Sequence, residues 1–573
     1  MSDDSPSQPR RTLKKGISAD DARRRRTVAV STIRKNKRVE NLRKRRSAAT
    51  SASAAAEVGS SALGGGGGPV VAADVGDLPA LCAALQNNSD RAGQTQAAER
   101  IRRMLSREKD PPAKPVIDAG ILPWLKETLL AHDAPQLQLE AAWALTNVAS
   151  TDYTQHVVDC GAVLPLTQLL RSKSADVREQ CIWCLGNIAG DGAALRDVVL
   201  ATPDVVAGLR ANLHSAASMS LLRNATWAAS NFCRGKPPPP LAAIAPLIPD
   251  IVTCTGCEDR EVMIDACWAL SYASDGGEEF IASILQCDAV PRLIQLMVSY
   301  GGMAAAGGDP HSEAVMTPVL RTLGNIVTGT DHQTQAAVEV GIVPALCAVL
   351  RHPKKTIRKE ACWALSNIAA GTLDQIVALL SVPGIVEEVK RIVVEDVSPV
   401  STEAIWIIAN LCTGGEADVV RHVVQSEVVE LMCAQLHEQN RRNAKVIEAA
   451  LDAISSMLTK SGAVPGDVAT KHAHEENIVT RIEECGGIEL IEQLQQHEEQ
   501  SIYEKASKII EKWFSAETDD EESDGGGAMG GAPLAMGGAG SFSLSAAFGA
   551  GAAAASPPAA PPAAFGGSSF SFS

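Results

Sequence analysis

The sequence lacks the features of a membrane-spanning, secreted or β-rich protein. It has no uncharged apolar stretch of roughly 18 residues or more, the length that a membrane span needs, and its basic, Ser-rich start has no apolar signal-peptide core. No long alternation of apolar and polar residues indicates β-strands. We therefore expect a soluble, intracellular and all-helical protein with no insertion into membranes.

Aromatic residues are also scarce, at 3% of the chain, so the regular spacing of the Trp residues is informative. Six of the eight Trp residues recur at intervals of 40, 44 and 41 residues in a first group and 43 residues in a second. This period matches the roughly 40–47 residues of armadillo or HEAT repeats. The six are Trp143, Trp183, Trp227, Trp268, Trp363 and Trp406.

A second phrase recurs between the Trp residues, as in CGAVLPLTQLL from Cys160 and CDAVPRLIQLM from Cys287. Gly or Asp ends one helix there, and Pro enters the next helix within its first turn, where its missing N–H has no helical partner to lose. Apolar residues then return at i, i+3, i+4 and i+7. The sequence thus predicts an array of helices over residues 77–514.

Charge is divided unevenly along the chain. Residues 1–50 contain 16 Lys and Arg against 5 Asp and Glu, whereas the whole chain has a formal net charge of −15. A basic arm is typical of nucleic-acid binding or disorder, but Ser18 and Asp21 form a capping-box pattern before a run of helix formers. We expect a basic helix that orders on an acidic partner, with no direct binding of nucleic acid. Residues 51–76, rich in Ala, Ser and Gly, are expected to be a flexible linker.

Residues 515–573 begin with an acidic run and continue as a low-complexity segment of Ala, Gly, Pro and Phe. Such a composition cannot form a packed core, so we expect a disordered tail. Five of the eight Phe residues lie here, several in FG or SFS settings. Two readings stay open: a solubilising tail, or weak contact with FG-type pore or transport components.

The sequence offers little for catalysis or metal binding. Its two CxxC pairs, Cys181/Cys184 and Cys254/Cys257, lie inside the helical array without a matching second pair for a tetrahedral site. No motif for hydrolysis, phosphate binding or metal catalysis is present. We expect these thiols to be core residues, and we expect no enzyme, no catalytic residue, no metal and no cofactor.

Five of the six Trp residues are followed four positions later by Asn, on the same face of a helix. Stacked repeats would align these pairs along a continuous concave groove. An Asn amide can hold the N–H and C=O of an extended peptide. Neighbouring Trp rings form slots for Lys or Arg stems, with cation–π attraction of roughly 0.5–2 kcal/mol each. Asp191, four residues after Asn187, is placed to receive a cationic head. Burial explains the Trp residues but not the recurrent Asn, so the pattern predicts a peptide-binding groove.

In combination, residues 10–514 resemble the importin α family of nuclear import adaptors. The basic clusters of the arm resemble an importin-β-binding domain, and the body resembles a right-handed superhelical solenoid of about ten armadillo repeats. The basic residues in question are Arg23, Arg24, Arg25, Arg26, Arg34, Lys35, Lys37, Arg38, Lys44, Arg45 and Arg46.

The resemblance also implies two binding sites for basic peptides. The major site would comprise Trp143, Asn147, Thr154, Gln180, Trp183, Asn187, Asp191, Trp227, Asn231, Asp265, Trp268 and Tyr272. The minor site would comprise Arg321, Asn325, Glu360, Trp363, Asn367, Glu403, Trp406 and Asn410. Arg321 stands at a Trp position, and the family shows the same interruption between its two sites.

Partners and location follow from the same resemblance. It implies cargo proteins with Lys- and Arg-rich nuclear localisation signals, importin β, a nuclear export receptor that engages the ECGG turn and final helix, and shuttling between cytoplasm and nucleus. Because Lys44, Arg45 and Arg46 look like cargo, the arm is expected to compete for the groove.

The chain departs from the family pattern in several places. Leu13 replaces a usual aromatic, the loop after Asn147 is shorter by about two residues, and residues 299–311 look like a flexible insertion. A catenin-like adhesion or signalling scaffold would share the armadillo body, but such scaffolds favour acidic ligands in basic grooves. Here acidic side chains lie beside the Trp ladder, that is, the six recurrent Trp residues and the Asn residues that follow them, and they argue against that alternative; they are Asp191, Asp265, Glu360 and Glu403.

Overall fold

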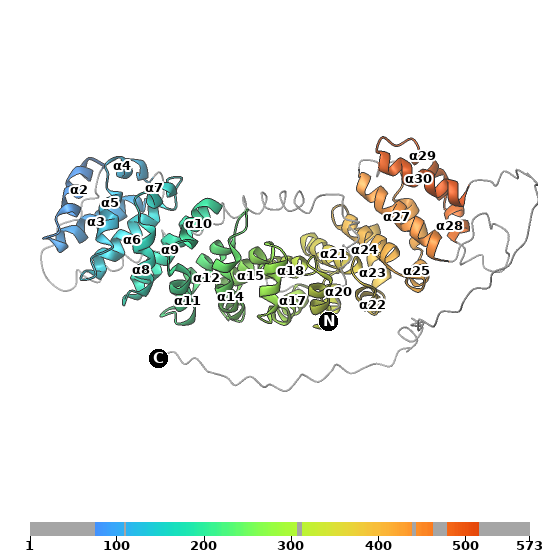
Figure 1. Ribbon diagram of the computed structural model, residues 1–573, viewed down its shortest axis with the longest axis horizontal. Coiled ribbons are helices and arrows are strands. Elements are labelled where there is room, and N and C mark those ends of the chain that lie inside the picture. Colours follow the sequence, from blue (N-terminus) through green and yellow to red (C-terminus); the bar gives the residue numbers. More distant parts are fainter. Residues whose placement is uncertain (1–74, 108–110, 306–311, 438–442, 462–477, 515–573) are drawn as a thin grey trace, which may run out of the picture. The chain divides into compact units, whose positions relative to one another are not determined.

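The computed structural model describes residues 75–107, 111–305, 312–437, 443–461 and 478–514. Within these ranges every regular element is a helix, and no strand occurs. The fold is an all-α armadillo-repeat solenoid, as the sequence predicts (Figure 1). The basic arm, the linker up to residue 74 and the tail from residue 515 lie outside the described residues.

The described helices group into ten repeats, each ending in a third helix that carries the ladder positions where present. Successive third helices pack against one another from α3 to α30, and each also packs against the second helix of its own repeat. The third helices are α3 (Arg91–Leu105), α6 (Pro135–Val148), α9 (Ala175–Asp191), α12 (Met219–Cys233), α15 (Arg260–Ser274), α18 (Ser312–Ile326), α21 (Lys355–Ala369), α24 (Val400–Gly414), α27 (Ala444–Lys460) and α30 (Gln500–Trp513).

The remaining helices flank these third helices in a regular order. The second helices are α2 (Leu78–Gln86), α5 (Leu122–Thr128), α8 (Val163–Gln168) with η2 (Leu169–Arg171), α11 (Val205–His214), α14 (Ile248–Cys254), α17 (Ala289–Ala305), α20 (Ile342–Ala348), α23 (Ile385–Glu395), α26 (Val428–Ala434) and α29 (Gly487–Leu494). The first helices are α4 (Ala113–Asp118), α7 (Thr154–Asp159), α10 (Ala193–Leu200), α13 (Leu241–Ile244) with η3 (Ala245–Leu247), α16 (Glu278–Leu285), α19 (Asp331–Glu339), α22 (Leu373–Leu380), α25 (Ala417–Val424) and α28 (Ile478–Glu484); η1 (Val75–Asp77) precedes α2.

In most repeats the turn between the first and second helices uses left-handed backbone, which explains the recurrent Gly or Asp. Gly161 has φ 77° and Gly341 has φ 88°, a region that costs Gly little. Asp204, at φ 65°, and Asp288, at φ 51°, hold the corresponding place in their repeats, as the sequence phrase predicts. Glu427 does so as well, at φ 53°, although its side chain is not one that favours this region.

Side-chain caps fix where many of the helices begin. Ser174 accepts a hydrogen bond from the N–H of Val177 at the start of α9, and Ser218 does the same for α12. Thr330 and Gln333 form a reciprocal capping box on α19, and the Gln333 amide also donates to the carbonyl of Glu278 in the preceding repeat. The same polar residues therefore set both helix boundaries and repeat stacking.

The expected flexible insertion at 299–311 is corrected in part. Residues up to Ala305 continue helix α17, because the apolar residues before them anchor that helix on α18; residues 306–311 lie outside the described part. Among the described residues, no single helix is long and apolar enough to cross a membrane, although the bent pair Glu278–Leu285 and Ala289–Gly301 meets that test by length and composition together.

Candidate peptide-binding groove

The ladder residues divide into a half-exposed ring and a buried amide. All six ladder Trp side chains are half-buried, and so is Arg321 at the interrupted position. The Asn residues four positions later are buried, from 0% exposed for Asn187 to 7% for Asn367. One turn of helix thus presents an aromatic face outward and places an amide beneath it.

Each of several Asn side chains bonds to the preceding repeat. The Nδ2 atom of Asn231 donates to the carbonyl of Gly186 at 3.1 Å, and that of Asn410 donates to the carbonyl of Ser366 at 2.8 Å. Asn187 bonds the carbonyl of Thr146 at 3.3 Å. In every case the acceptor directly precedes the Asn of the earlier repeat. The recurrence of Asn therefore has a structural cause in addition to the predicted peptide contact, because an amide has a second N–H and an acceptor oxygen.

The Trp rings likewise lean on the repeat before them. A Cβ added at Gly186 would lie 2.4 Å from the Trp227 ring, and one added at Gly324 would lie 2.2 Å from the Trp363 ring. Glycine at these two helix positions thus leaves room for the indole. Trp268, the ladder residue without an Asn, stacks on Tyr272 at 5.9 Å between ring centroids. The rings are held by packing before any ligand arrives.

The first ladder ring already has a cation on it. The guanidinium carbon of Arg102 lies 4.4 Å from the centroid of the Trp143 ring. Its Nε donates to Glu140 at 2.8 Å, and the Glu140 side chain is only 5% exposed. The Nδ2 atom of Asn147 donates to Ser106 Oγ at 3.0 Å, one turn beyond Arg102 on the same helix. Repeats one and two are therefore joined around Trp143.

The other predicted residues of the major site take different positions. Gln180 is 6% exposed and donates to Thr146 Oγ1 at 2.7 Å, which ties it to the preceding repeat. Thr154 is 1% exposed, and its hydroxyl donates to the carbonyl of Thr151 at 2.9 Å. It therefore supports the loop between α6 and α7 and does not lie beside the half-exposed Trp rings. Asp191, the last residue of α9, is exposed one turn beyond Asn187. Asp265 is half-buried on α15, three residues before Trp268.

The minor-site residues occupy α18, α21 and α24. Glu360 is paired with Lys359 at 3.0 Å, so a cation of the chain itself already lies beside this carboxylate. Glu403 is half-buried, three residues before Trp406 on α24. Asn325 donates to Ser274 Oγ at 3.0 Å and so bonds α15.

Sequence reasoning missed two polar residues that lie three positions before a ladder Trp. Position −3 from each ladder Trp carries a polar side chain, and it lies on the Trp face of the helix. Gln180, Asp265, Glu360 and Glu403 were recognised there, whereas Glu140 and Asn224 were not. Asn224 and Ser220 both donate to Glu179, at 2.8 Å for Asn224. Tabulating position −3 in every repeat would have found both.

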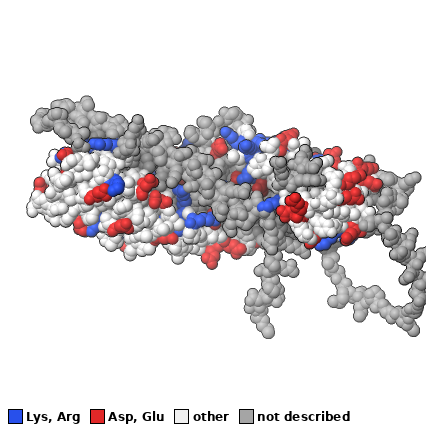
Figure 2. All heavy atoms as spheres, turned by 90° about the horizontal axis from the view of Figure 1, so that it is seen from above, with Lys and Arg blue, Asp and Glu red and all other residues white. Residues whose placement is uncertain are grey.

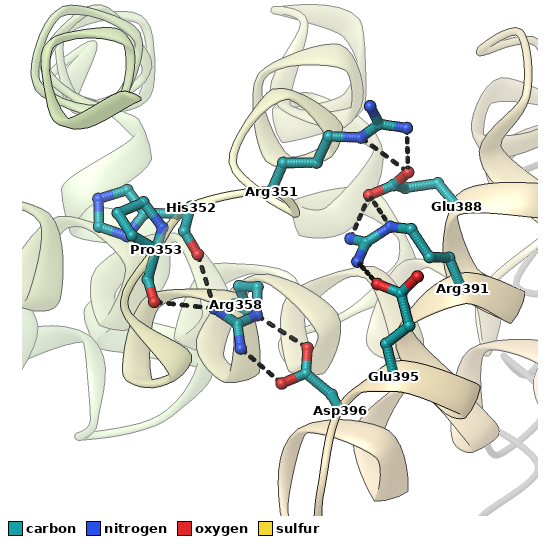
Figure 3. Close-up of polar contacts among 8 residues, drawn as sticks. All are labelled: Arg351, His352, Pro353, Arg358, Glu388, Arg391, Glu395 and Asp396. Atoms are coloured by element: carbon teal, nitrogen blue, oxygen red, sulfur yellow. Dashed lines mark hydrogen bonds and ion pairs between the residues drawn. The ribbon is translucent and has the colours of Figure 1, made fainter. Parts of the chain in front are cut away.

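A cavity of about 460 Å³ lies apart from the ladder residues, between the start of α21 and the end of α23 (Figure 3). Arg358 donates to Asp396, and Arg351 and Arg391 both donate to Glu388. Burial alone would raise the pKa of Glu388, but the two guanidinium groups lower it overall. Each of the three guanidinium groups is already paired with a carboxylate of the chain. The cavity is therefore part of the junction between repeats seven and eight and not an anion site.

The CxxC thiols are mostly core residues. Cys181, Cys184 and Cys254 are buried, and Cys257 is half-buried. Burial raises the pKa of Cys184 to about 12 and that of Cys254 to about 11, so these thiols stay protonated at neutral pH. Within the described ranges, no group of three or more His, Cys, Asp or Glu side chains could hold a metal ion.

Charge around the array is predominantly acidic. Residues 77–514 contain 36 Lys and Arg against 54 Asp and Glu, a formal charge of −18. Figure 2 shows one face, on which acidic side chains form several clusters with basic ones between them. A negative surface attracts basic ligands over a distance set by the ionic strength. The predicted residues Arg23 to Arg46 of the arm lie outside the described residues.

Comparison with known proteins identifies the family. A model of the importin beta binding domain matches residues 10–99, the armadillo/beta-catenin-like repeat matches residues 109–150, 150–190 and 330–370, and an atypical Arm repeat matches residues 476–526. Importin subunit alpha-1a of Oryza sativa subsp. japonica is 38% identical over 524 residues, 89% of this chain and 93% of that protein.

Further relatives agree. Importin subunit alpha-3 of Arabidopsis thaliana is 38% identical over 89% of this chain and 92% of its own length. The crystal structure of an engineered protein superposes with a TM-score of 0.64 at 25% identity, covering 76% of this chain and 98% of that one. The chain carries the armadillo array and the importin-β-binding arm together, and it therefore belongs to the importin α family of nuclear import adaptors.

Proposed function

We propose that this adaptor binds Lys- and Arg-rich nuclear localisation signals along the Trp ladder and links them, through residues 1–50, to importin β. The observation that carries the proposal is the Arg102 guanidinium on the Trp143 ring, with Glu140 as its counter-ion. A ladder Trp with a carboxylate three residues earlier is thus an environment that accepts a guanidinium. Trp363 and Trp406 repeat this arrangement with Glu360 and Glu403, and Trp268 repeats it with Asp265.

The major site would use the rings of Trp183 and Trp227 and the exposed carboxylate of Asp191. Both rings are half-exposed, and the Trp227 ring packs over Gly186 of the preceding repeat, so that ring needs little ordering when a peptide binds. The Asn amides other than Asn187, which is 0% exposed, would supply directional contacts to a peptide backbone without reading its side chains. The minor site would use the rings of Trp363 and Trp406.

The arm would act as an internal competitor for the groove. Lys44, Arg45 and Arg46 are joined to the array by about 30 residues, 47–76, whose root-mean-square span of roughly 5–6 Å × √30, or about 30 Å, reaches the first repeats. With an effective concentration on the order of 1 mM and a local affinity on the order of 10 μM, masking weakens cargo binding roughly 100-fold. Importin β would remove the competitor by binding the arm, which favours cargo loading in the cytoplasm and release in the nucleus.

The final repeat would contact a nuclear export receptor through the ECGG turn and α30. Two roles of the Phe-containing tail, residues 515–573, remain alternatives: it keeps the protein in solution, or it contacts nuclear pore components.

A titration of a fluorescent basic signal peptide tests the groove and the switch together. We expect Trp183→Ala to cost on the order of 2–4 kcal/mol of binding, as a central aromatic does, and Asp191→Lys to weaken binding by on the order of 10-fold through like-charge repulsion. Glu339→Lys is the matched control, because it makes the same charge change at an exposed position on α19 away from the ladder.

The switch is tested in the same assay. Protein lacking residues 1–50, the Lys44→Ala variant and wild type with importin β should all bind the peptide more tightly than wild type alone. Equal affinities across these conditions would refute the switch while leaving the groove standing. Unchanged affinity in folded Trp183→Ala and Asp191→Lys proteins would refute the groove.

A further inference from the structure

The thiols of Cys433 and Cys485 lie together at the junction of repeats nine and ten. Cys433 is on α26 and 1% exposed; Cys485 follows the last residue of α28 and is half-buried. Each thiol shifts the pKa of the other, so the two side chains lie close together, and Cys485 Sγ itself donates to the carbonyl of Ile482 at 3.4 Å. A Cβ added at Gly487 would lie 2.7 Å from Cys433 Sγ, and Gly487 is only two residues from Cys485 along the chain. Gly487 therefore leaves room for the Cys433 thiol beside the turn that carries Cys485.

An ion pair holds the two helices on either side of these thiols. Arg481 on α28 donates to both carboxylate oxygens of Glu430 on α26, at 2.7 and 2.5 Å, and its Nη1 donates to the carbonyl of Val424. Glu430 is three residues before Cys433, and Arg481 is four residues before Cys485. Residues three or four positions apart lie on the same face of a helix, so the ion pair and the two thiols lie on the faces by which α26 and α28 meet. Such a bidentate contact fixes helix spacing and orientation.

The protonation of the pair is asymmetric. The nearby Cys433 thiol lowers the pKa of the Cys485 thiol, whereas the nearby Cys485 thiol and burial raise the pKa of Cys433. Cys485 is also the more exposed of the two thiols, and exposure together with a lowered pKa favours attack on a peroxide. Cys433 has the position of a resolving thiol.

From this geometry we propose that Cys433 and Cys485 form a reversible disulfide in response to hydrogen peroxide and thereby fasten repeat nine to repeat ten. The Cys485 thiolate attacks one peroxide oxygen, the O–O bond breaks, and the departing oxygen leaves as water after taking up a proton. The sulfur of Cys433 then attacks the Cys485 sulfenic acid, its proton joins the departing hydroxide, and a second water leaves. Two thiols lose two electrons in total, and one peroxide is reduced to two waters; a dithiol reductant reverses the step.

The consequence is a second covalent link across a long connection. The chain from α27 to α28 passes through residues 462–477, which lie outside the described part, so the backbone joins the two repeats only by that route. A bond from Cys433 to Cys485 would close a loop spanning 52 positions, and closing so long a loop stabilises the folded junction against local opening.

The experiment uses the full chain, reduced, freed of reductant and treated with hydrogen peroxide at low protein concentration before the remaining thiols are alkylated. Trypsin places Cys433 in residues 422–441 and Cys485 in residues 482–505, each fragment with one Cys. We expect mass spectrometry under non-reducing conditions to find these fragments linked within one chain. The buried pair Cys181/Cys184 is the internal control and should stay reduced.

Two variants separate the reaction from a passive role. Cys433→Ser should leave Cys485 to form a sulfenic acid that dimedone traps, and Cys485→Ser should leave Cys433 unreacted. Hydrogen exchange in α28 and α29 should slow by on the order of 10-fold in oxidised wild type relative to oxidised Cys433→Ser. Linkage of Cys181 to Cys184 at the same rate, Cys485-linked dimers in place of the internal bond, absence of any linked fragment, or unchanged exchange would each overturn the proposal. Peptide binding plays no part in this test, so its result is independent of the proposed groove.

Discussion

Arg102 covers one face of Trp143, with its guanidinium carbon 4.4 Å from the ring centroid, and at the same time pairs with Glu140. The contact joins α3 of the first repeat to α6 of the second. The first ladder ring is therefore closed on one side by the chain itself, and a peptide has only its other side to use.

Removing that cation should destabilise the N-terminal repeats. Arg102→Ala leaves the Glu140 carboxylate, 5% exposed, without its partner, and we expect a loss of about 3–5 kcal/mol in the free energy of unfolding. Urea titration followed by circular dichroism measures it. The double variant Arg102→Met, Glu140→Gln should recover most of the loss, because no buried charge remains.

Arg91 supplies the control on the same helix. It pairs with Asp133 at 3.3 Å, but the two side chains are 41% and 66% exposed. Arg91→Ala should therefore cost less than about 1 kcal/mol. Similar losses for Arg102→Ala and Arg91→Ala would contradict the importance of burial at the first site.

A methyl group behind a ladder ring should weaken peptide binding. Ala is ordinarily better than Gly inside a helix by roughly 0.5–1 kcal/mol, but in Gly186→Ala the new Cβ would lie 2.4 Å from the Trp227 ring. We expect the ring to shift and the affinity for a basic peptide to fall on the order of 10-fold. Fluorescence anisotropy measures this, with Gly192→Ala as control, since nothing lies within 4 Å of a Cβ there. An affinity equal to that of the control would exclude a positioning role for Gly186.

Substituting the Trp residues of the proposed minor site should weaken the binding of peptides with two basic clusters more than that of peptides with one. Trp363→Ala with Trp406→Ala removes the rings of the proposed minor site. A two-cluster peptide gains avidity from simultaneous contact, so we expect its affinity to fall by on the order of 10-fold or more. A single-cluster peptide held by Trp183 and Trp227 should change little. Equal losses measured by calorimetry for both peptides would argue against two separable sites.

The Arg223–Asp259 pair predicts a stability contribution that acid removes. The hydrogen bonds from Arg223 lower the pKa of Asp259 below its ordinary value of 3.8, and the same carboxylate caps α15 through the N–H of Val262. A carboxyl with a lowered folded pKa stabilises fully above its unfolded pKa and loses that contribution as pH falls through the folded pKa. Because Arg223 is 38% exposed, we expect only about 1 kcal/mol.

Asp259→Asn keeps a capping side chain and removes the charge. The stability difference between wild type and this variant should be constant from about pH 7 to 5 and shrink below about pH 4. Urea titrations at each pH measure it, and Glu339→Gln, at an exposed position, should show almost no difference at any pH. A difference in the free energy of unfolding that grows as the pH falls would contradict the predicted direction of the pH dependence.

The repeat length and the helix-ending turns were predictable because the residues that determine them lie within one repeat. The Trp spacing predicted the repeat length, and a Gly or Asp at the end of a first helix marked a turn that the structure builds with positive φ, as at Gly161 and Asp288. Glu427 shows the limit of that rule, since a residue with no such preference holds the same turn. The surrounding repeat, and not the local residue, fixes the backbone there.

Contacts between repeats were not predictable from the period. Arg102 and Trp143 are 41 positions apart, and nothing in either helix pattern indicates that one lies over the other. The bond from Asn231 to the carbonyl of Gly186 depends equally on how far adjacent third helices are rotated and shifted. That register follows from the packing of all three helices in both repeats.

The contacts of Trp227 and Asn231 with Gly186 mean that no recognition element belongs to a single repeat. If one repeat were moved into another solenoid, its Trp and Asn would arrive without the surface that orients them. The smallest exchangeable part is a pair of neighbours with their common face. Lengthening such a protein by duplication would add a whole junction, and the rotation at that junction would decide which residue of an extended ligand the new position meets.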